Sequence, residues 1–341
     1  MRCLSAIVSL IVLPIAAAAA DPVPSVKDRS VKETINRGLT FLAKDNLSWK
    51  EKRQCAECHH APFTIWALNE GKRQGYTVDE KALADLTSWV VTKDHLAKLV
   101  AKPPMQEQIE VNEAPLLLAL GIEAGDAKAT QDGLRKMLTS VLSDQDKDGS
   151  WKLSYEFRPI GSSPQTLTIL ALLALSAPNA PDMGKEGKAA RERGLKWLRD
   201  AKPDEELQAA ALRIILWRRL ELPATEWNPL VEKLRGAQNA DGGWSQIEKA
   251  KSDAYATGQV LYALAEVGVK PGDEAVRKAQ SFLAQTQREN GAWPMESRAI
   301  MRDGKPPKDL DPITHAGSAW AVMGLIRTSP DMAKPGRTDA K

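Results

Sequence analysis

Cysteine is scarce in this sequence, with three residues in a chain of 341. Cys3 falls in the apolar segment at the N-terminus, so Cys55 and Cys58 are the only cysteines in the rest of the chain. Two cysteines separated by two residues cannot provide the disulfide framework that is typical of small secreted domains. The pair therefore needs a chemical explanation of its own.

The sequence also lacks an excess of charge and a long apolar run. The formal net charge is +3, so no basic stripe is available to neutralise phosphates, and a nucleic-acid partner is not expected. Beyond the N-terminal segment, no stretch approaches the roughly 18 apolar residues that a membrane-spanning helix requires. We therefore expect no stable membrane span.

The first twenty residues have the pattern of a secretory signal peptide. Arg2 supplies a positive charge, an apolar run follows, and small residues precede Asp21, which predicts cleavage near Ala20. A periplasmic or secreted location follows, with an uncleaved anchor as the alternative. We expect a linker over residues 21–29, one folded domain over 30–328, and a polar, disordered tail over 329–341.

Three loops share one pattern, in which Gln, Gly and Trp occur at fixed spacing. The loops are Gln145-x3-Gly149-x-Trp151, Gln238-x3-Gly242-x-Trp244 and Gln287-x3-Gly291-x-Trp293. The first two tryptophans are about twice as far apart as the last two, which indicates a further repeat between them. A segment at Gly194–Leu198 is similar to Gly38–Leu42 and supplies that repeat.

Each repeat predicts an amphipathic helix followed by a nearly apolar helix. The first amphipathic helix opens with the capping box Ser30-x-x-Glu33, and a later one is expected to begin at Asn228-Pro229. A helix that is apolar on most sides is buried on most sides. The apolar helices are expected at residues 62–74, 113–124, 164–177, 206–220, 253–267 and 313–327. This alternation predicts an all-α protein with six outer and six inner helices, arranged as a closed ring or as an open solenoid.

The Gln-x3-Gly-x-Trp loops, each followed by an Ala- and Leu-rich helix, resemble those of the prenyltransferase and squalene-cyclase repeat superfamily. The resemblance covers about residues 30 to 328 and implies an α/α toroid of about six helix hairpins. It also implies that the loops are structural, with Gln and Trp joining the end of one outer helix to its neighbour. Squalene cyclases use an Asp-x-Asp-Asp acid, which this sequence lacks, so squalene cyclisation is not expected.

The nearest acidic elements are Asp253 and the pair Asp309-x-Asp311. Asp253 is a weak candidate for a catalytic acid and is equally consistent with a helix N-cap, because it directly precedes an apolar run. The zinc-dependent prenyltransferases of the superfamily use a cysteine on a late inner helix, and this sequence has none there. Asp144-x-Asp146-x-Asp148 resembles the start of a calcium loop, but Tyr155 replaces the bidentate Glu. Neither calcium nor zinc is expected.

The segment Cys55-Ala56-Glu57-Cys58-His59 matches the C-x-x-C-H pattern of c-type haem attachment, in a loop expected at 49–61. Two thiols at this spacing can add to the haem vinyl groups, and the next histidine then reaches the iron. The motif stands where a Gln-Gly-Trp loop would otherwise precede the first inner helix. A short disulfide, or a zinc site that includes His59 or His60, remains an alternative.

Ring closure would place the first and last repeats side by side, so a second axial ligand is expected from neighbours of the haem motif. His315 is the first candidate because it begins an inner helix, and Met105 is the second. Met295, Met301 and His95 are further candidates, and a merely structural His315 is the alternative.

Three functions follow from these patterns. The first is an exported haem-c protein in electron transfer, redox chemistry or sensing, with a periplasmic redox partner. The second is a terpenoid-cyclase-like enzyme, or a lipid- or isoprenoid-binding protein, that holds an apolar ligand in the ring. The third is a non-catalytic scaffold. The fold itself does not select among them.

Overall fold

A computed structural model describes most of the predicted domain, over residues 29–55, 59–92, 94–95, 121, 128–152, 158–178, 180–202, 204–300 and 304–329. Within these ranges the regular elements are helices, and strand-like pairing is limited to isolated bridges such as that between Trp244 and Asp253. The prediction of an all-α protein is confirmed. None of the helices in this part of the chain combines the length and apolarity needed to cross a bilayer.

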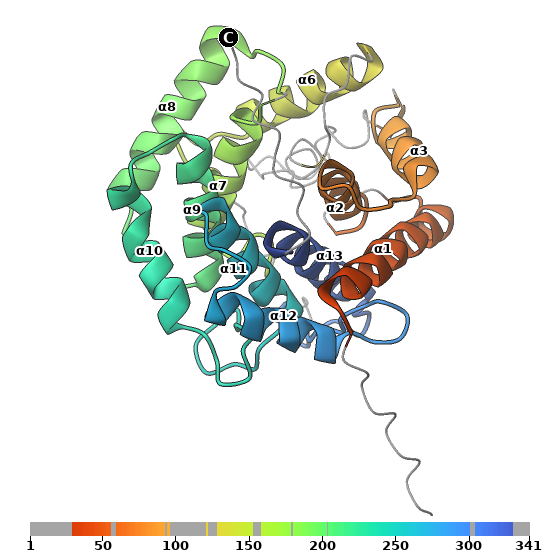
Figure 1. The fold of residues 1–341 in the computed structure, drawn as a ribbon. Helices are drawn as coiled ribbons and strands as arrows, with labels where there is room; N and C mark the ends of the chain where they lie inside the picture. Colours follow the sequence, from red (N-terminus) through yellow and green to blue (C-terminus); the bar gives the residue numbers. More distant parts are fainter. Residues whose placement is uncertain are drawn as a thin grey trace, which may run out of the picture.

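Six of the helices in the described part of the chain form the outer layer of the ring, whose arrangement can be followed in Figure 1. Each buries one side only, and α12, for example, buries Val276, Ala279 and Leu283 while its charged residues face solvent. The outer helices are α1 (Val31–Arg53), α3 (Glu80–Val90), α6 (Lys128–Ser143), α8 (Gly184–Asp200), α10 (Ala224–Gly236) and α12 (Glu274–Thr286).

Five inner helices lie inside this layer, and they are buried on almost every side. In α7 all residues from Gln165 to Leu175 are buried. The inner helices are α2 (Ala61–Arg73), α7 (Pro164–Leu175), α9 (Leu207–Arg219), α11 (Ala254–Glu266) and α13 (Asp311–Thr328). They match five of the six predicted apolar segments; the remaining one, 113–124, lies outside the described residues except for Gly121.

One predicted helix start is wrong. Helix α10 begins at Ala224 after Pro223, and Pro229 lies inside the helix rather than at its cap. Proline has no N–H, so the bond to the carbonyl of Thr225 is missing, but the remaining turns continue the helix. A proline followed by apolar residues resembles a helix start, whereas the turn that precedes Pro229 is mostly polar and carries no such signal.

The three Gln-x3-Gly-x-Trp loops make the same contacts. The indole N–H of Trp151, Trp244 and Trp293 donates to a carbonyl near the end of the preceding outer helix, over 2.7, 2.6 and 2.8 Å respectively. The Gln side chain of each loop donates to a carbonyl of the next outer helix, as Gln145 does to Ala190. Glycine is needed because its φ is positive, +97° at Gly149, and because a Cβ there would meet the carbonyl of Arg193. The loops are therefore structural joints, as predicted.

The third loop closes the ring. Gln287 donates to the carbonyl of Thr34 on α1 over 3.0 Å, although the two residues are separated by most of the chain. Gly291 lies against the carbonyl of Arg37 on the same helix. Helix α13 packs against both α1 and α2, so the last repeat lies beside the first. The toroid is confirmed and the open solenoid is excluded.

Helices α11 and α13 cross in direct contact. A Cβ on Gly258 would lie 2.2 Å from the carbonyl of Trp320, and one on Gly324 would lie 2.4 Å from the carbonyl oxygen of Gly258. Only glycine allows backbones to approach this closely. Helices α11 and α13 are therefore in backbone contact, with no layer of side chains between them at these glycines.

Candidate functional site

The cysteine motif connects α1 to α2 at the end of the ring where the inner helices begin. Helix α1 ends at Arg53, and Gln54 reverses the chain in the left-handed conformation with φ 52°. Cys55 follows and is half-buried; Cys58 lies outside the described residues. His59 is half-buried, and His60, which is fully buried, immediately precedes α2.

Beside the motif, three side chains from distant parts of the chain meet. These are Asp45 of α1, His60 before α2, and His315 in the second turn of α13. One potential ligand atom from each lies within 4.8 Å of the others. His315 Nδ1 lies 2.7 Å from Asp45 Oδ2, and His60 Nε2 lies 3.3 Å from the same oxygen. We call these three residues the closure cluster, because ring closure assembles it.

His315 is anchored at both ring nitrogens. Nδ1 pairs with Asp45, and Nε2 lies 2.8 Å from the hydroxyl of Thr64 on α2. The same hydroxyl is 3.4 Å from the carbonyl oxygen of Leu42, to which it can donate. The chain therefore fixes the orientation of His315 with partners from α1 and α2. To act as a distal haem ligand, His315 would have to give up one of these bonds.

His60 lacks comparable partners. Its 3.3 Å approach to Asp45 is not aligned as a hydrogen bond, and neither ring nitrogen has a hydrogen-bond partner. The ring is stacked between Trp49 and His315, with centroids 4.0 and 4.1 Å away. A buried polar group without a partner costs about 1–3 kcal/mol, so this imidazole is costly to keep for packing alone.

Asp45 carries the negative charge of the closure cluster. Although burial raises the pKa of the Asp45 carboxyl, the hydrogen bond with His315 and the proximity of His60 hold that pKa well below its usual range. Burial, reinforced by the neighbouring His315, lowers the pKa of His60 to about 4 despite the nearby carboxylate. Burial also lowers the pKa of His59, to about 3, and lowers the pKa of His315. At neutral pH the site holds a carboxylate and neutral imidazoles.

A surface groove reaches this cluster from the α1 side. Its volume is about 640 Å³. Phe41 and Asp45 line it, and the ring of Phe41 lies 6.0 Å from that of His315. Its other walls include Lys44 and Ser48 of α1 and Glu289 and Asn290 of the closing loop. Asp45, with its side chain 33% exposed, is therefore the member of the cluster that a solute meets first.

The other predicted axial ligands are not all placed. Met105 and Met301 lie outside the described residues. Met295 is buried against Gly317 of α13, and the ring of His95 lies tilted against that of Trp89 near the end of α3, with centroids 4.4 Å apart. Of the predicted distal ligands in the described part, the structure brings His315 into the group around His59 and His60.

Asp253 is the N-cap of α11. Oδ1 accepts from the N–H of Ala256 over 2.8 Å, and Oδ2 accepts from the amide of Gln246 over 3.1 Å. Burial raises the pKa of its carboxyl to about 6 despite these bonds. The capping role is thus present, and the side chain also has the raised pKa that an acid would need. Asp309 is 46% exposed and lies 3.4 Å from Arg53.

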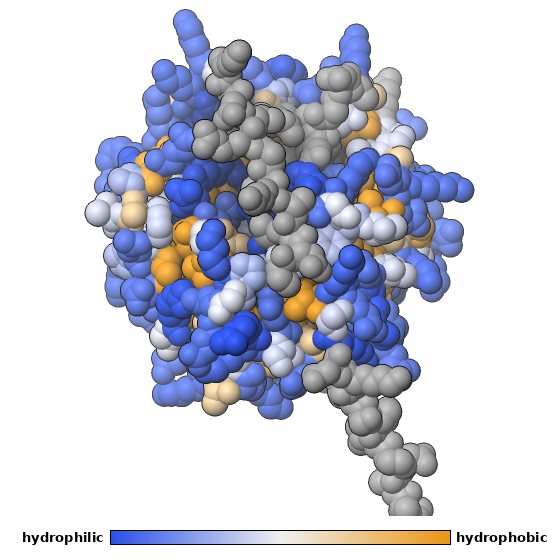
Figure 2. Space-filling view, in the orientation of Figure 1, coloured by the Kyte–Doolittle hydropathy of each residue, from blue (hydrophilic) through white to orange (hydrophobic). Residues whose placement is uncertain are grey.

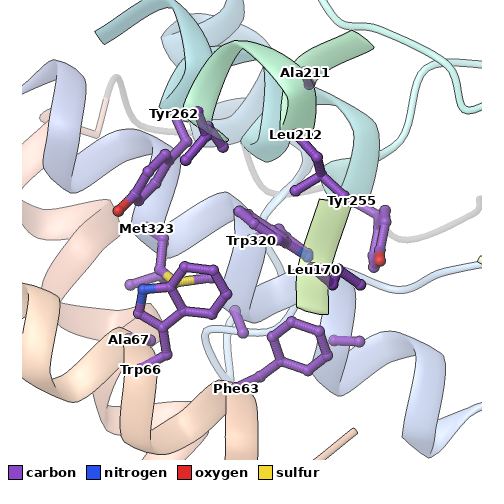
Figure 3. Close-up of a cluster of buried hydrophobic side chains, with 14 of the residues drawn as sticks. Phe63, Trp66, Ala67, Leu170, Ala211, Leu212, Tyr255, Tyr262, Trp320 and Met323 are labelled. Atoms are coloured by element: carbon purple, nitrogen blue, oxygen red, sulfur yellow. The ribbon is translucent and has the colours of Figure 1, made fainter. Parts of the chain in front are cut away.

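The aromatic residues of the inner helices pack on one another. Figure 3 shows Trp320 between Trp66, Tyr255 and Tyr262, with Phe63 nearby. The ring of Trp320 lies 5.3 Å from Trp66 and about 6 Å from the other three, and each of the five is at most 4% exposed. These side chains fill the crossing region of the inner helices as a core.

The acidic loop at residues 144–148 is bound by a lysine. Lys152 Nζ lies 2.6 Å from Asp148 and 3.1 Å from Asp146, so an ammonium occupies the position between these carboxylates. Asp144 is buried at the end of α6.

Sequence reasoning missed Asp45, Trp49 and Thr64. Asp45 stands three residues after the core residue Leu42, on the buried side of α1, where a carboxylate is unusual. Asn46, which is buried, is the next residue along the helix. A half-buried carboxylate beside a buried amide on a mostly apolar face is the signal that could have indicated a site.

Comparison with known proteins agrees with this architecture. The family model of the squalene-hopene cyclase C-terminal domain matches residues 223–336. The squalene–hopene cyclase of Bradyrhizobium diazoefficiens is 32% identical over 96 residues, which are 28% of this chain and 14% of that protein. The similarity thus spans about one seventh of the curated relative.

Solved structures share the fold along most of the chain. The apo form of the type II terpene cyclase MstE from Scytonema has a TM-score of 0.53 and 14% identity, over 89% of this chain and 99% of that one. A protein from Actinoplanes gives a TM-score of 0.56 at 14% identity, over 87% and 99%. A possible member of the GH105 family from Salmonella enterica gives 0.55 at 12%, over 93% and 98%. At such identities the likeness concerns the fold alone. The chain is therefore a squalene-cyclase-like α/α toroid, whose last third matches the C-terminal domain of the squalene-hopene cyclases.

Proposed function

We propose that this toroid is exported and carries a haem attached to Cys55 and Cys58, with His59 as an axial ligand. In this role it acts in electron transfer, redox chemistry or sensing with a periplasmic partner. The observation that carries the proposal is the position of the C-x-x-C-H motif. It replaces the structural loop of the first repeat and adjoins a buried polar cluster rather than a hydrophobic joint.

The described residues of the motif are chemically suited to this role. Burial lowers the pKa of His59 to about 3, so its imidazole is neutral and can bind a metal at physiological pH. Cys55 is half-buried and follows directly on the residue that caps α1. Trp49 and Phe41 add apolar surface near the motif. A bound haem would supply a one-electron centre at this end of the ring.

A redox partner would meet a largely hydrophilic surface. Figure 2 shows polar residues over most of the described face, with scattered apolar ones. Large apolar residues are exposed singly, at Ile247, Ile300 and Leu310. Such a surface is typical of transient contacts, which many electron-transfer proteins use.

The test uses the full chain expressed with its leader in a host that has a haem-maturation system. We expect a haem stain that survives denaturation and a mass increase of one haem. The double variant Cys55→Ser/Cys58→Ser should lose both signals, whereas Lys52→Gln, an exposed change next to the motif, should keep them. A wild-type mass equal to that of the bare mature polypeptide would refute the proposal.

A second function is favoured by Asp253. Its carboxyl has a pKa raised to about 6 by burial, and Tyr255 of the aromatic core lies two residues away. Protonation of an alkene needs a carboxylic acid in an apolar setting, and the fold is shared with a terpene cyclase. Incubation with isoprenoid diphosphates and polyprenols, with Asp253→Asn as the control, tests this alternative. A cyclic product that is absent with the variant would favour it over the haem proposal.

A further inference from the structure

We infer that the closure cluster of Asp45, His60 and His315 binds one divalent first-row transition-metal ion, with the iron or zinc class as its natural occupant. The inference does not rest on haem attachment, because none of its ligands is a cysteine or His59. It departs from the sequence-based expectation that no zinc binds, since Asp45 could not be foreseen as a ligand.

The geometry of the donor atoms supports this inference. Two ligands of a tetrahedral ion at about 2.0–2.1 Å lie roughly 3.4 Å apart. The closure cluster places His60 Nε2 at 3.3 Å and His315 Nδ1 at 2.7 Å from Asp45 Oδ2, and one ligand atom from each residue lies within 4.8 Å of the others. The two imidazoles are stacked at 28°, so coordination requires His60 to rotate its ring edge toward Asp45. Small side-chain movements therefore complete the site.

The unpartnered imidazole is a second, independent observation. His60 is fully buried, and neither of its nitrogens has a hydrogen-bond partner, although the carboxylate of Asp45 is close by. The ring is stacked between Trp49 and His315, which offer it no polar partner through their ring faces. A metal ion would give Nε2 the partner that it lacks.

Thr64 provides the support that a metal-binding histidine needs. Metal-bound histidines usually bond a protein group through the other ring nitrogen, which fixes the ring orientation. His315 has this arrangement, with Nδ1 directed at Asp45 and Nε2 bonded to Thr64. On metal binding, the neutral ring changes tautomer: Nδ1 loses its proton, Nε2 gains one, and His315 releases no net proton. Nε2–H then donates to the Thr64 hydroxyl, whose own proton turns to the carbonyl of Leu42.

The donor set selects the kind of ion. Two imidazoles and one carboxylate suit Fe²⁺, Zn²⁺ and their neighbours, whereas Ca²⁺ and Mg²⁺ prefer sites made of oxygen ligands. Three protein ligands leave at least one position for water or a small ligand. That position would face the groove of about 640 Å³, because Asp45 lines both the groove and the cluster.

The experiment measures metal content and affinity in the full chain. Protein is stripped with a chelator and titrated with Co²⁺ and Zn²⁺, and the bound metal is measured by mass spectrometry and by the Co²⁺ absorption bands. We expect one bound ion in wild type and in Cys55→Ser/Cys58→Ser. Binding should be lost in Asp45→Asn and His60→Gln and kept in Asp85→Asn, which changes an exposed carboxylate on α3.

Further variants keep the test decisive if a ligand variant fails to fold. Thr64→Val retains all three ligands, and we expect it to weaken Co²⁺ binding by about 10–100-fold with a normal circular dichroism spectrum. The inference is overturned if the stripped wild type binds no ion. It is also overturned if binding survives in Asp45→Asn and His60→Gln but is lost with the cysteines. A missing haem stain, by contrast, would refute only the haem proposal.

Discussion

The crossing of α11 and α13 makes a quantitative prediction for Gly258→Ala. An added Cβ would lie 2.2 Å from the carbonyl of Trp320, more than 1 Å inside ordinary contact, and the obstacle is backbone rather than a flexible side chain. The two helices must separate, and overpacking of this kind costs about 1–3 kcal/mol. Alanine recovers up to about 1 kcal/mol of helix propensity. We expect a net loss of about 1–2 kcal/mol in the free energy of unfolding.

The matched control is Gly236→Ala in α10. A Cβ at Gly236 meets nothing within 4 Å, so only the propensity gain remains. Guanidinium denaturation followed by circular dichroism should show Gly236→Ala to be equal to or more stable than wild type, and Gly258→Ala to be less stable. The dependence of the unfolding free energy on denaturant concentration should be similar in all three proteins. If both variants shift in the same direction by the same amount, the inner helices do not cross as described, and a space between them must exist.

Three further outcomes are expected. The pKa of His60 is about 4 in the folded protein and about 6.5 when unfolded, so the unfolded state binds more protons between these values. His60 should therefore contribute a fall in stability of roughly 3 kcal/mol as pH drops from about 6.5 to 4, in addition to the contributions of His59 and His315, whose pKa values are also lowered. Denaturation of His60→Gln should lack the contribution of His60. Asp253→Asn should keep its cap and remain within about 0.5 kcal/mol of wild type at pH 7, whereas Asp253→Ala should lose about 1 kcal/mol in thermal denaturation. Squalene incubated with wild type should give no polycyclic product by gas chromatography; a product that Asp253→Asn abolishes would contradict this.

The alternation of helix types could be predicted from sequence because it follows from burial alone. An outer helix such as α12 shows apolar residues at helical spacing, and an inner helix such as α7 is apolar throughout. The Gln-x3-Gly-x-Trp loops could be assigned a structural role because each part has a physical task. Ring closure is implied by the resemblance to the squalene-cyclase superfamily, because helical periodicity alone does not indicate whether the repeats form a closed ring.

The closure cluster could not be predicted, because it depends on contacts between distant repeats and not on burial within one helix. Asp45 and His315 are 270 residues apart, and their contact exists only when the last repeat meets the first. Helical spacing places Asp45 on a buried face but does not say what it faces. The prediction that ring closure brings His315 near the cysteine motif relied on topology, and the structure does place it beside His60. Its role as a ligand stays a prediction.

The first repeat differs from the three repeats with a Gln-x3-Gly-x-Trp loop in how its joint is made. In a standard joint the backbone N–H of the loop tryptophan donates to a hydroxyl near the start of an inner helix, as Trp244 does to Thr257. Thr257 is the fourth residue of α11, and Thr64 is the fourth residue of α2, but Thr64 lies against His315 instead.

The carbonyl of the outer helix also has a different partner in the first repeat. In the third joint the indole N–H of Trp293 donates to the carbonyl of Leu283 on α12. Leu42 is the corresponding residue of α1, because it follows Gly38 by four residues as Leu283 follows Ala279. The carbonyl of Leu42 instead lies 3.4 Å from the hydroxyl of Thr64. Thr64 and Leu42 thus contact each other beside His315, whereas the corresponding groups of the other joints bond to a loop tryptophan. A structural joint needs only an apolar plug with one N–H donor, which Trp supplies in the three other loops. Replacing it with two histidines and a carboxylate gains nothing for packing, so a ligand is the simpler explanation for the change.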